Sequence, residues 1–179
     1  FGPSWHQAAV REKRNKPHED FIAVAEDLIS SKVCKAKTLA IRGGSGGGLL
    51  VANAFVMRPE LFGAVHCAVP ILDMKRYKDL QLDDAPDWTS EFGDPDTSDW
   101  KVFMKQFSPY HNIKKDTKKY PPILFTANTN DDRIHPAHAR KMVKKMWILG
   151  QGKRWPTYYY ENVEGGNGLP ATPRQERSA

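Results

Sequence analysis

The segment Leu39–Leu50 reads Leu-Ala-Ile-Arg-Gly-Gly-Ser-Gly-Gly-Gly-Leu-Leu. It begins with a short apolar run typical of a strand, passes through a turn made almost entirely of glycine, and ends in the start of an apolar helix. Ser45 carries the only hydroxyl group of this segment. The five residues Gly43–Gly47 match the pattern G-x-S-x-G, in which a serine stands at a sharp strand-to-helix turn. The segment therefore predicts an exposed, nucleophilic Ser45 at the end of a strand.

The glycines around Ser45 have a steric and a chemical purpose. A Cβ on either side would obstruct the strained backbone and the close approach of neighbouring helices. The N–H of Gly46 and the start of the following helix point to where negative charge develops on an attacked carbonyl. We predict Gly46 as the oxyanion donor, through its backbone amide.

The composition is that of a globular chain. It has 179 residues, 40% of them hydrophobic and 27% charged, which is enough for one domain or most of one. The net charge of +6 comes largely from lysines in Lys114–Lys119 and Lys141–Lys153. No nucleic-acid motif accompanies these runs, so we interpret them as solvated faces and predict no nucleic-acid partner.

Several other classes of protein find no support in the sequence. No apolar window approaches a membrane span, and no secretory signal is present. Cys34 and Cys67 are the only cysteines, and Cys67 lies in an apolar run, as a buried free thiol would. We therefore predict a reducing, cytoplasmic location. The histidines show no metal-ligand spacing and the glycines no phosphate-binding loop, so neither a metal nor a cofactor is predicted.

Strands and helices alternate along the chain. Helices are predicted over Glu19–Ser31, over Gly46–Arg58 and from Pro136 to a stop at Gly150, and strands over Thr38–Arg42, Ala64–Pro70, Pro122–Ala127 and Thr157–Tyr160. Residues 71–120 are predicted to be irregular, with an aromatic-rich insert at Trp88–Phe92. This alternation indicates a parallel sheet with helices on both faces.

Three loops at the carboxyl ends of the strands carry the candidate chemistry, because functional residues of parallel sheets gather at that edge. The loops 43–46, 128–133 and 163–168 contain Ser45, the pair Asp131 and Asp132, and Asn167. The order serine, acid, base in the last loop is the order of the catalytic triad in α/β-hydrolases. Asn167, however, stands where a histidine is expected.

On these residues the chain resembles the catalytic domain of the prolyl oligopeptidases, α/β-hydrolase serine peptidases that cleave short peptides after proline. Gly43–Leu50 resembles the family's Gly-Gly-Ser-Asn-Gly-Gly-Leu-Leu elbow. Further counterparts are Phe1–His6, Arg58–Gly63, Trp88–Gly93, Ser108–Asn112 and Asp131–Arg133. The resemblance implies an α/β-hydrolase fold and a short peptide as substrate.

The resemblance also implies the roles of individual residues. Asp131 would orient the catalytic base, and Arg133 would hold a carbonyl group of the substrate backbone. Trp88 would stack on the proline ring at the cleavage site, with Ile71 and Phe92 completing an apolar pocket. Without the resemblance, Trp88 would be interpreted as a packing residue and Arg133 equally well as a surface ion-pair residue.

The segment Glu164–Gly168 aligns with the family's Glu-x-Gly-His-Gly loop, which puts Asn167 in the position of the catalytic histidine. An amide can donate to Asp131 and accept from Ser45, but it cannot exchange a proton near neutral pH. His135 and His138, the last histidines of the chain, are interpreted as structural residues at and after the entry to a helix. Two explanations of Asn167 fit equally: an inactive homologue, or a single-base change of a histidine codon.

The sequence thus predicts residues 1–179 as a partial α/β-hydrolase peptidase domain whose activity Asn167 impairs. The resemblance implies that further strands and a β-propeller lie outside the chain, leaving unpaired backbone beside Thr38–Arg42. A non-catalytic peptide-binding homologue and a small-ester hydrolase remain as alternatives. No oligomeric state is predicted.

Overall fold

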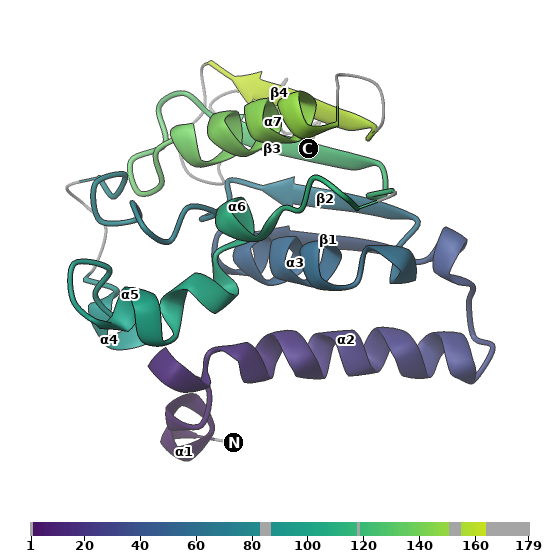
Figure 1. The fold of residues 1–179 in the computed structure, drawn as a ribbon, viewed down its shortest axis with the longest axis horizontal. Helices are drawn as coiled ribbons and strands as arrows, with labels where there is room; N and C mark the ends of the chain where they lie inside the picture. The colour runs from purple at the N-terminus through teal and green to yellow at the C-terminus, as the bar shows by residue number, and fades with distance from the viewer. Residues whose placement is uncertain (1, 83–86, 118, 151–154, 164–179) are drawn as a thin grey trace, which may run out of the picture.

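The computed structural model describes residues 2–82, 87–117, 119–150 and 155–163. Its strands form one parallel sheet in the order β1-β2-β3-β4 (Figure 1). The strands are β1 (Ala40–Gly44), β2 (Ala64–Ala68), β3 (Ile123–Asn128) and β4 (Thr157–Asn162). All four predicted strands are therefore present, and the α/β-hydrolase class of fold is confirmed in its mostly parallel sheet flanked by helices.

The three predicted helices are also present, with shifted ends. They are α2 (Asn15–Ser30), α3 (Gly46–Met57) and α7 (Ala137–Leu149). Helix α2 begins before the predicted start at Glu19 because Pro17 lies in its first turn, where the missing N–H is not needed for helical hydrogen bonds. Two short elements precede it, α1 (Pro3–Gln7) and the 3₁₀ turn η1 (Arg11–Lys13).

The prediction of an irregular segment over residues 71–120 is wrong in part. This segment contains α4 (Thr89–Phe92), α5 (Asp99–Val102), the 3₁₀ turn η4 (Met104–Phe107) and α6 (Pro109–Asn112). Two further 3₁₀ turns, η2 (Ala36–Thr38) and η3 (Pro59–Leu61), flank β1 and β2. Elements of a single turn show no periodicity in the sequence and form through tertiary packing.

One face of the sheet carries the main core. Ile41, Val65 and Ile123 are aligned across the sheet and are all buried against the helices. Helices α3 and α7 contact this face, and α2 packs on α3 (Figure 1). On the opposite face Tyr158 and Tyr160 are 59% and 60% exposed. The sequence predicted helices on both faces, whereas the described helices that contact the sheet lie on one.

A second apolar cluster joins the short helices to the start of α3. Its buried members are Leu49, Ile71, Met74, Tyr77, Phe92, Phe103, Met104, Phe107 and Ile134. Because this cluster includes residues of the segment after β2, of helix α4 and of the loop after β3, it fixes these three parts relative to one another. The segments that follow β2 and β3 and the short helix α4 are therefore packed together at the carboxyl edge of the sheet.

The free cysteines agree with the sequence interpretation. Cys34 and Cys67 are both free thiols, and Cys67 is fully buried. Burial raises the pKa of the Cys67 thiol, so this sulfur is a packing group. Among the described helices, none combines the length and apolar character that crossing a membrane requires.

Two histidines are buried in the neutral form. Burial, with a smaller contribution from Arg14, lowers the pKa of His18 from 6.5 to about 4. Burial also lowers the pKa of His138 to about 3. His18 contacts the side-chain amide of Asn53 at 3.3 Å between Nε2 and Nδ2, which joins α2 to α3. Protonation of either ring would place a positive charge in the core, which burial disfavours; at His138 the Asp73 carboxylate offsets only part of this cost.

We expect acid to weaken the fold before the carboxylates titrate. The pKa of each ring is lower in the folded than in the unfolded chain. Each ring therefore makes its full contribution to the free energy of unfolding above pH 6.5, where it is neutral in both states. This contribution is lost as the pH falls from 6.5 toward the folded pKa. The His18 shift corresponds to about 3 kcal/mol. Urea unfolding at a series of pH values measures this slope, which His18→Gln should reduce; a free energy of unfolding that stays constant from about pH 7 to about pH 4.5 would contradict this assignment.

Candidate active site

Ser45 stands at a strained turn between β1 and α3. Its backbone has φ 55° and ψ −120°, in the left-handed half of conformational space that few non-glycine residues adopt. Its N–H donates to the carbonyl oxygen of Ala68 at 3.0 Å, and its own carbonyl oxygen accepts from the Leu49 N–H at 3.2 Å. The end of β2 and the first turn of α3 therefore hold Ser45 in place.

The steric need for glycine falls on two positions around Ser45, Gly43 before it and Gly48 after it. A Cβ on Gly43 would overlap the carbonyl oxygen of Gly47, and one on Gly48 would lie 2.8 Å from the Cβ of Pro70. In contrast, a Cβ on Gly46 or on Gly47 would meet no atom within 4 Å. The expectation that a side chain would obstruct both flanks of Ser45 therefore holds at Gly43 and Gly48, and it is corrected at Gly46 and Gly47, where there is room for a Cβ.

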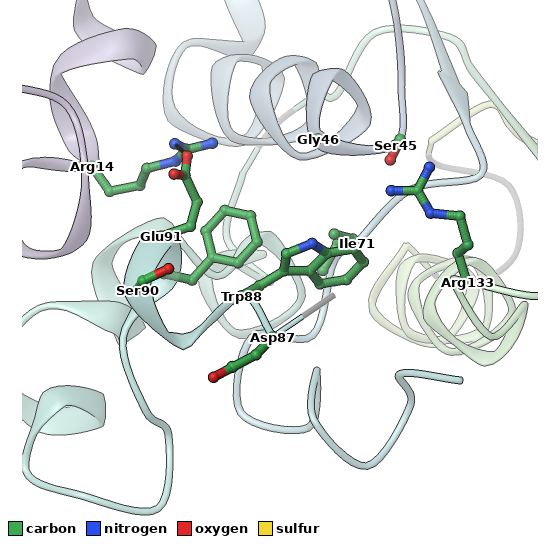
Figure 2. Close-up of a pocket in the computed structure, with 10 residues that line it drawn as sticks. Arg14, Ser45, Gly46, Ile71, Asp87, Trp88, Ser90, Glu91 and Arg133 are labelled. Atoms are coloured by element: carbon green, nitrogen blue, oxygen red, sulfur yellow. Dashed lines mark hydrogen bonds and ion pairs between the residues drawn. The ribbon is translucent and has the colours of Figure 1, made fainter. Parts of the chain in front are cut away.

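Six residues singled out from the sequence line one pocket of about 380 Å³. They are Ser45, Gly46, Ile71, Trp88, Phe92 and Arg133. Arg14, Asp87, Ser90 and Glu91 complete the lining (Figure 2). In Figure 2 the Arg133 guanidinium lies beside Ser45 on one side of the pocket, and Trp88 lies between them and Glu91.

The apolar wall of this pocket is made of packed rings. Trp88 and Phe92 meet edge to face, with ring centroids 6.1 Å apart and an interplanar angle of 74°. Ile71 and Phe92 are buried, and Trp88 is partly exposed toward the pocket. Such a wall offers a flat apolar surface to a small ring of a ligand.

Asp131 organises the loop that presents Arg133. The carboxylate is 3% exposed, and its Oδ1 accepts from the backbone N–H groups of Arg133 at 3.0 Å and Ile134 at 2.8 Å. Arg133 is exposed, and no described residue forms an ion pair with it. Asp131 does not line the Ser45 pocket; it follows β3 at the same edge of the sheet where Ser45 follows β1.

Asn167 lies outside the described residues, but the strand that leads to it is tied to the Asp131 loop. The Thr129 N–H donates to the carbonyl oxygen of Asn162 at 2.9 Å. The Asn130 side chain donates to the carbonyl oxygen of Val163 at 3.2 Å. The loop after β3 and the end of β4 are therefore held side by side.

Glu161 strengthens this connection, and the sequence analysis missed it. Its carboxylate accepts from Thr129 Oγ1 at 2.6 Å, from Arg140 Nε at 2.9 Å and from the Tyr159 hydroxyl. The hydrogen bonds from Arg140, Thr129 and Tyr159 lower the pKa of Glu161 to about 2. The one signal in the sequence was an acidic residue at the carboxyl end of a tyrosine-rich strand, which does not reveal its partners.

The two histidines nearest to Asp131 in sequence have structural contacts. His138 is buried, and its Nδ1 accepts from the backbone N–H groups of Leu72 at 3.3 Å and Asp73 at 3.1 Å. The Nδ1 of His135 accepts from the Ala137 N–H at 3.1 Å, at the start of α7. Both rings therefore accept hydrogen bonds from the backbone, which agrees with the structural role predicted from the sequence.

The parallel sheet, the serine turn and the acidic loop at its carboxyl edge define a protein of the α/β-hydrolase class. The profile of the prolyl oligopeptidase family matches residues 1–165. The chain therefore belongs to the prolyl oligopeptidase family, as its motifs indicated.

Individual relatives agree with this assignment. An uncharacterized peptidase of Sinorhizobium fredii is 42% identical over 171 residues, which are 96% of this chain and 23% of that protein. The structure of a post-proline cleaving enzyme from Rickettsia typhi is similar with a TM-score of 0.83 at 41% identity, over 94% of this chain and 23% of that one. Prolyl oligopeptidase B from Galerina marginata, solved with a 35mer hydrolysis and macrocyclization substrate, has a TM-score of 0.82 at 28% identity, over 91% of this chain and 23% of that one. The chain thus spans about a quarter of the length of these relatives.

We expect Gly43→Ala to disrupt the serine turn and Gly46→Ala to leave it intact. The new methyl group at position 43 would overlap backbone and should cost about 3 kcal/mol or more. At position 46 it enters open space at the start of a helix, so the free energy of unfolding should change by less than about 1 kcal/mol. Urea unfolding followed by circular dichroism compares the two variants, and equal effects would refute the close approach of helix to strand at Gly43.

Proposed function

We propose that this chain is the serine-bearing part of a peptidase that cleaves short peptides after proline through an acyl-enzyme, and that Asn167 impairs the reaction. The observation that carries the proposal is the common pocket of Ser45, Trp88 and Arg133. A nucleophile, a ring-binding wall and a cation for a backbone carbonyl then face one ligand. The Rickettsia typhi and Galerina marginata relatives support the choice of substrate.

In the proposed reaction the Ser45 Oγ attacks the carbonyl carbon that follows the proline ring, and its proton passes to a base. The Gly46 N–H stabilises the oxyanion. The proton then moves to the leaving nitrogen, the C–N bond breaks and an acyl-serine remains, which water hydrolyses by the same steps. Asp131 is proposed to orient the base and Arg133 to hold a carbonyl group of the peptide.

In this proposal Asn167 impairs the transfer of the Ser45 proton, because an amide is not a base near neutral pH. Removal of the triad histidine from a serine protease lowers kcat about a million-fold, and the oxyanion hole and binding alone leave about 10³–10⁴ over water. A pocket that binds a peptide but hardly cleaves it also fits a non-catalytic, peptide-binding homologue, which is the second candidate function. The wall of Trp88, Ile71 and Phe92 favours this candidate, because contacts among described residues hold it together.

We expect a fluorophosphonate probe to label Ser45 poorly in this chain and at least about a thousand times faster in Asn167→His. The imidazole restores a base, whereas the amide offers none. Mass spectrometry locates the label, and Ser45→Ala in the Asn167→His background is the matched control. A folded Asn167→His chain that stays unlabelled, yet binds a proline peptide, would favour the peptide-binding homologue. Hydrolysis of a small ester without cleavage of a prolyl amide would favour an esterase.

A further inference from the structure

Helix α4 cannot hold its own position. It has four residues, Thr89–Phe92, and Trp88 precedes it as the N-cap. A single turn of helix is unstable by itself, because fixing its backbone dihedral angles costs more free energy than its first hydrogen bond provides. The orientation of the Trp88 ring must therefore come from contacts with other parts of the chain.

Arg14 supplies such a contact from a distant part of the sequence. It lies just before α2, and its Nη1 forms an ion pair with Glu91 of α4. Its guanidinium also lies over the Phe92 ring, 4.9 Å from the ring centroid, as a cation–π contact. The Arg14 side chain is only 17% exposed, so water screens these two interactions less than on an open surface.

The contacts of Arg14 continue to Trp88 through Phe92. The Phe92 ring meets the Trp88 ring edge to face, and on another side it meets Tyr77, with centroids 5.9 Å apart. The Tyr77 hydroxyl donates to the Gly93 carbonyl oxygen at 2.7 Å, which closes the end of α4. In Figure 2, Arg14 and Glu91 stand at the end of the pocket away from Ser45, with Trp88 between.

We propose that Arg14 is a positioning residue that sets the Trp88 wall through Glu91 and Phe92 and thereby determines the preference of the pocket for a proline ring. The inference rests on the proposed function and deepens it, since Arg14 itself does not contact the reacting atoms. Because the stacking surface depends on the angle of one indole, loss of Arg14 should weaken binding of a ring more than binding of a methyl group.

The test measures a ratio of affinities. The probes are acetyl-glycyl-proline and acetyl-glycyl-alanine, titrated by calorimetry into the 179-residue chain and its variants. A loss of folded protein changes the number of binding sites for both probes equally and leaves the ratio of dissociation constants unchanged. We expect Arg14→Ala to reduce the preference for the proline probe about 3- to 10-fold.

Three further variants complete the experiment. Arg14→Lys retains the charge without the planar guanidinium and should give an intermediate ratio. Glu91→Gln removes the carboxylate charge that pairs with Arg14 and that also contacts His6 Nε2 at 2.6 Å. It should also reduce the ratio, which keeps the test informative if Arg14→Ala does not fold. Arg58→Ala removes an exposed arginine that pairs with Glu26 and Glu60, and should leave the ratio unchanged.

The outcomes separate this inference from the proposed function. If the unmodified chain binds both probes equally, the proposed preference for proline is wrong, and the positioning role of Arg14 is wrong as well. If the unmodified chain prefers proline and the Arg14 and Glu91 variants keep that preference, the proposed function stands and the positioning role of Arg14 is overturned.

Discussion

The rest of the site depends on one steric constraint, the approach of helix α3 to strand β1 at Gly43. There the Gly47 carbonyl occupies the space that a side chain at position 43 would need, and Ser45, in the turn between these two glycines, has a positive φ. A conformation of this kind costs on the order of 1–3 kcal/mol and persists only where its surroundings impose it. Here the surroundings are a helix buried on almost every side, including Val51, Ala52 and Phe55. The packing of α3 in the core thus stabilises a backbone conformation of Ser45 that the isolated turn would not adopt.

The order of the strands places the Asp131 loop at the same edge of the sheet as Ser45. Because all four strands are parallel, the loops after β1, β3 and β4 emerge at one edge, and hydrogen bonds then set their spacing. The Thr129 amide bonds to the end of β4, and Glu161 gathers Thr129, Tyr159 and Arg140 on one carboxylate. The strong ionisation of Glu161 reflects these donors. A residue outside the reacting set therefore joins the acid-bearing loop to the strand that precedes the last loop.

The sequence predicted what local sterics and periodicity determine. The alternation of strands and helices identified each strand in the described part of the chain, and the glycine run located the serine turn, because both signals arise within a few neighbouring residues. The pocket residues Trp88, Ile71 and Phe92 came from the resemblance, since an isolated tryptophan says nothing of its surroundings. Helix α4 and the Arg14–Glu91 pair were not predictable. Arg14 and Glu91 are 77 residues apart in sequence, and a single turn of helix such as α4 leaves no pattern in the sequence.

The division of the site between elements bears on what Asn167 changes. The apolar wall of the pocket belongs to α4 with its N-cap and to the segment after β2, and Arg133 belongs to the loop after β3. None of these elements includes the last loop of the chain. In the proposed mechanism an asparagine at position 167 cannot accept a proton near neutral pH, as a histidine can. The contacts described for the wall are made by residues of other segments, so in this proposal peptide binding and turnover are separate properties of the site.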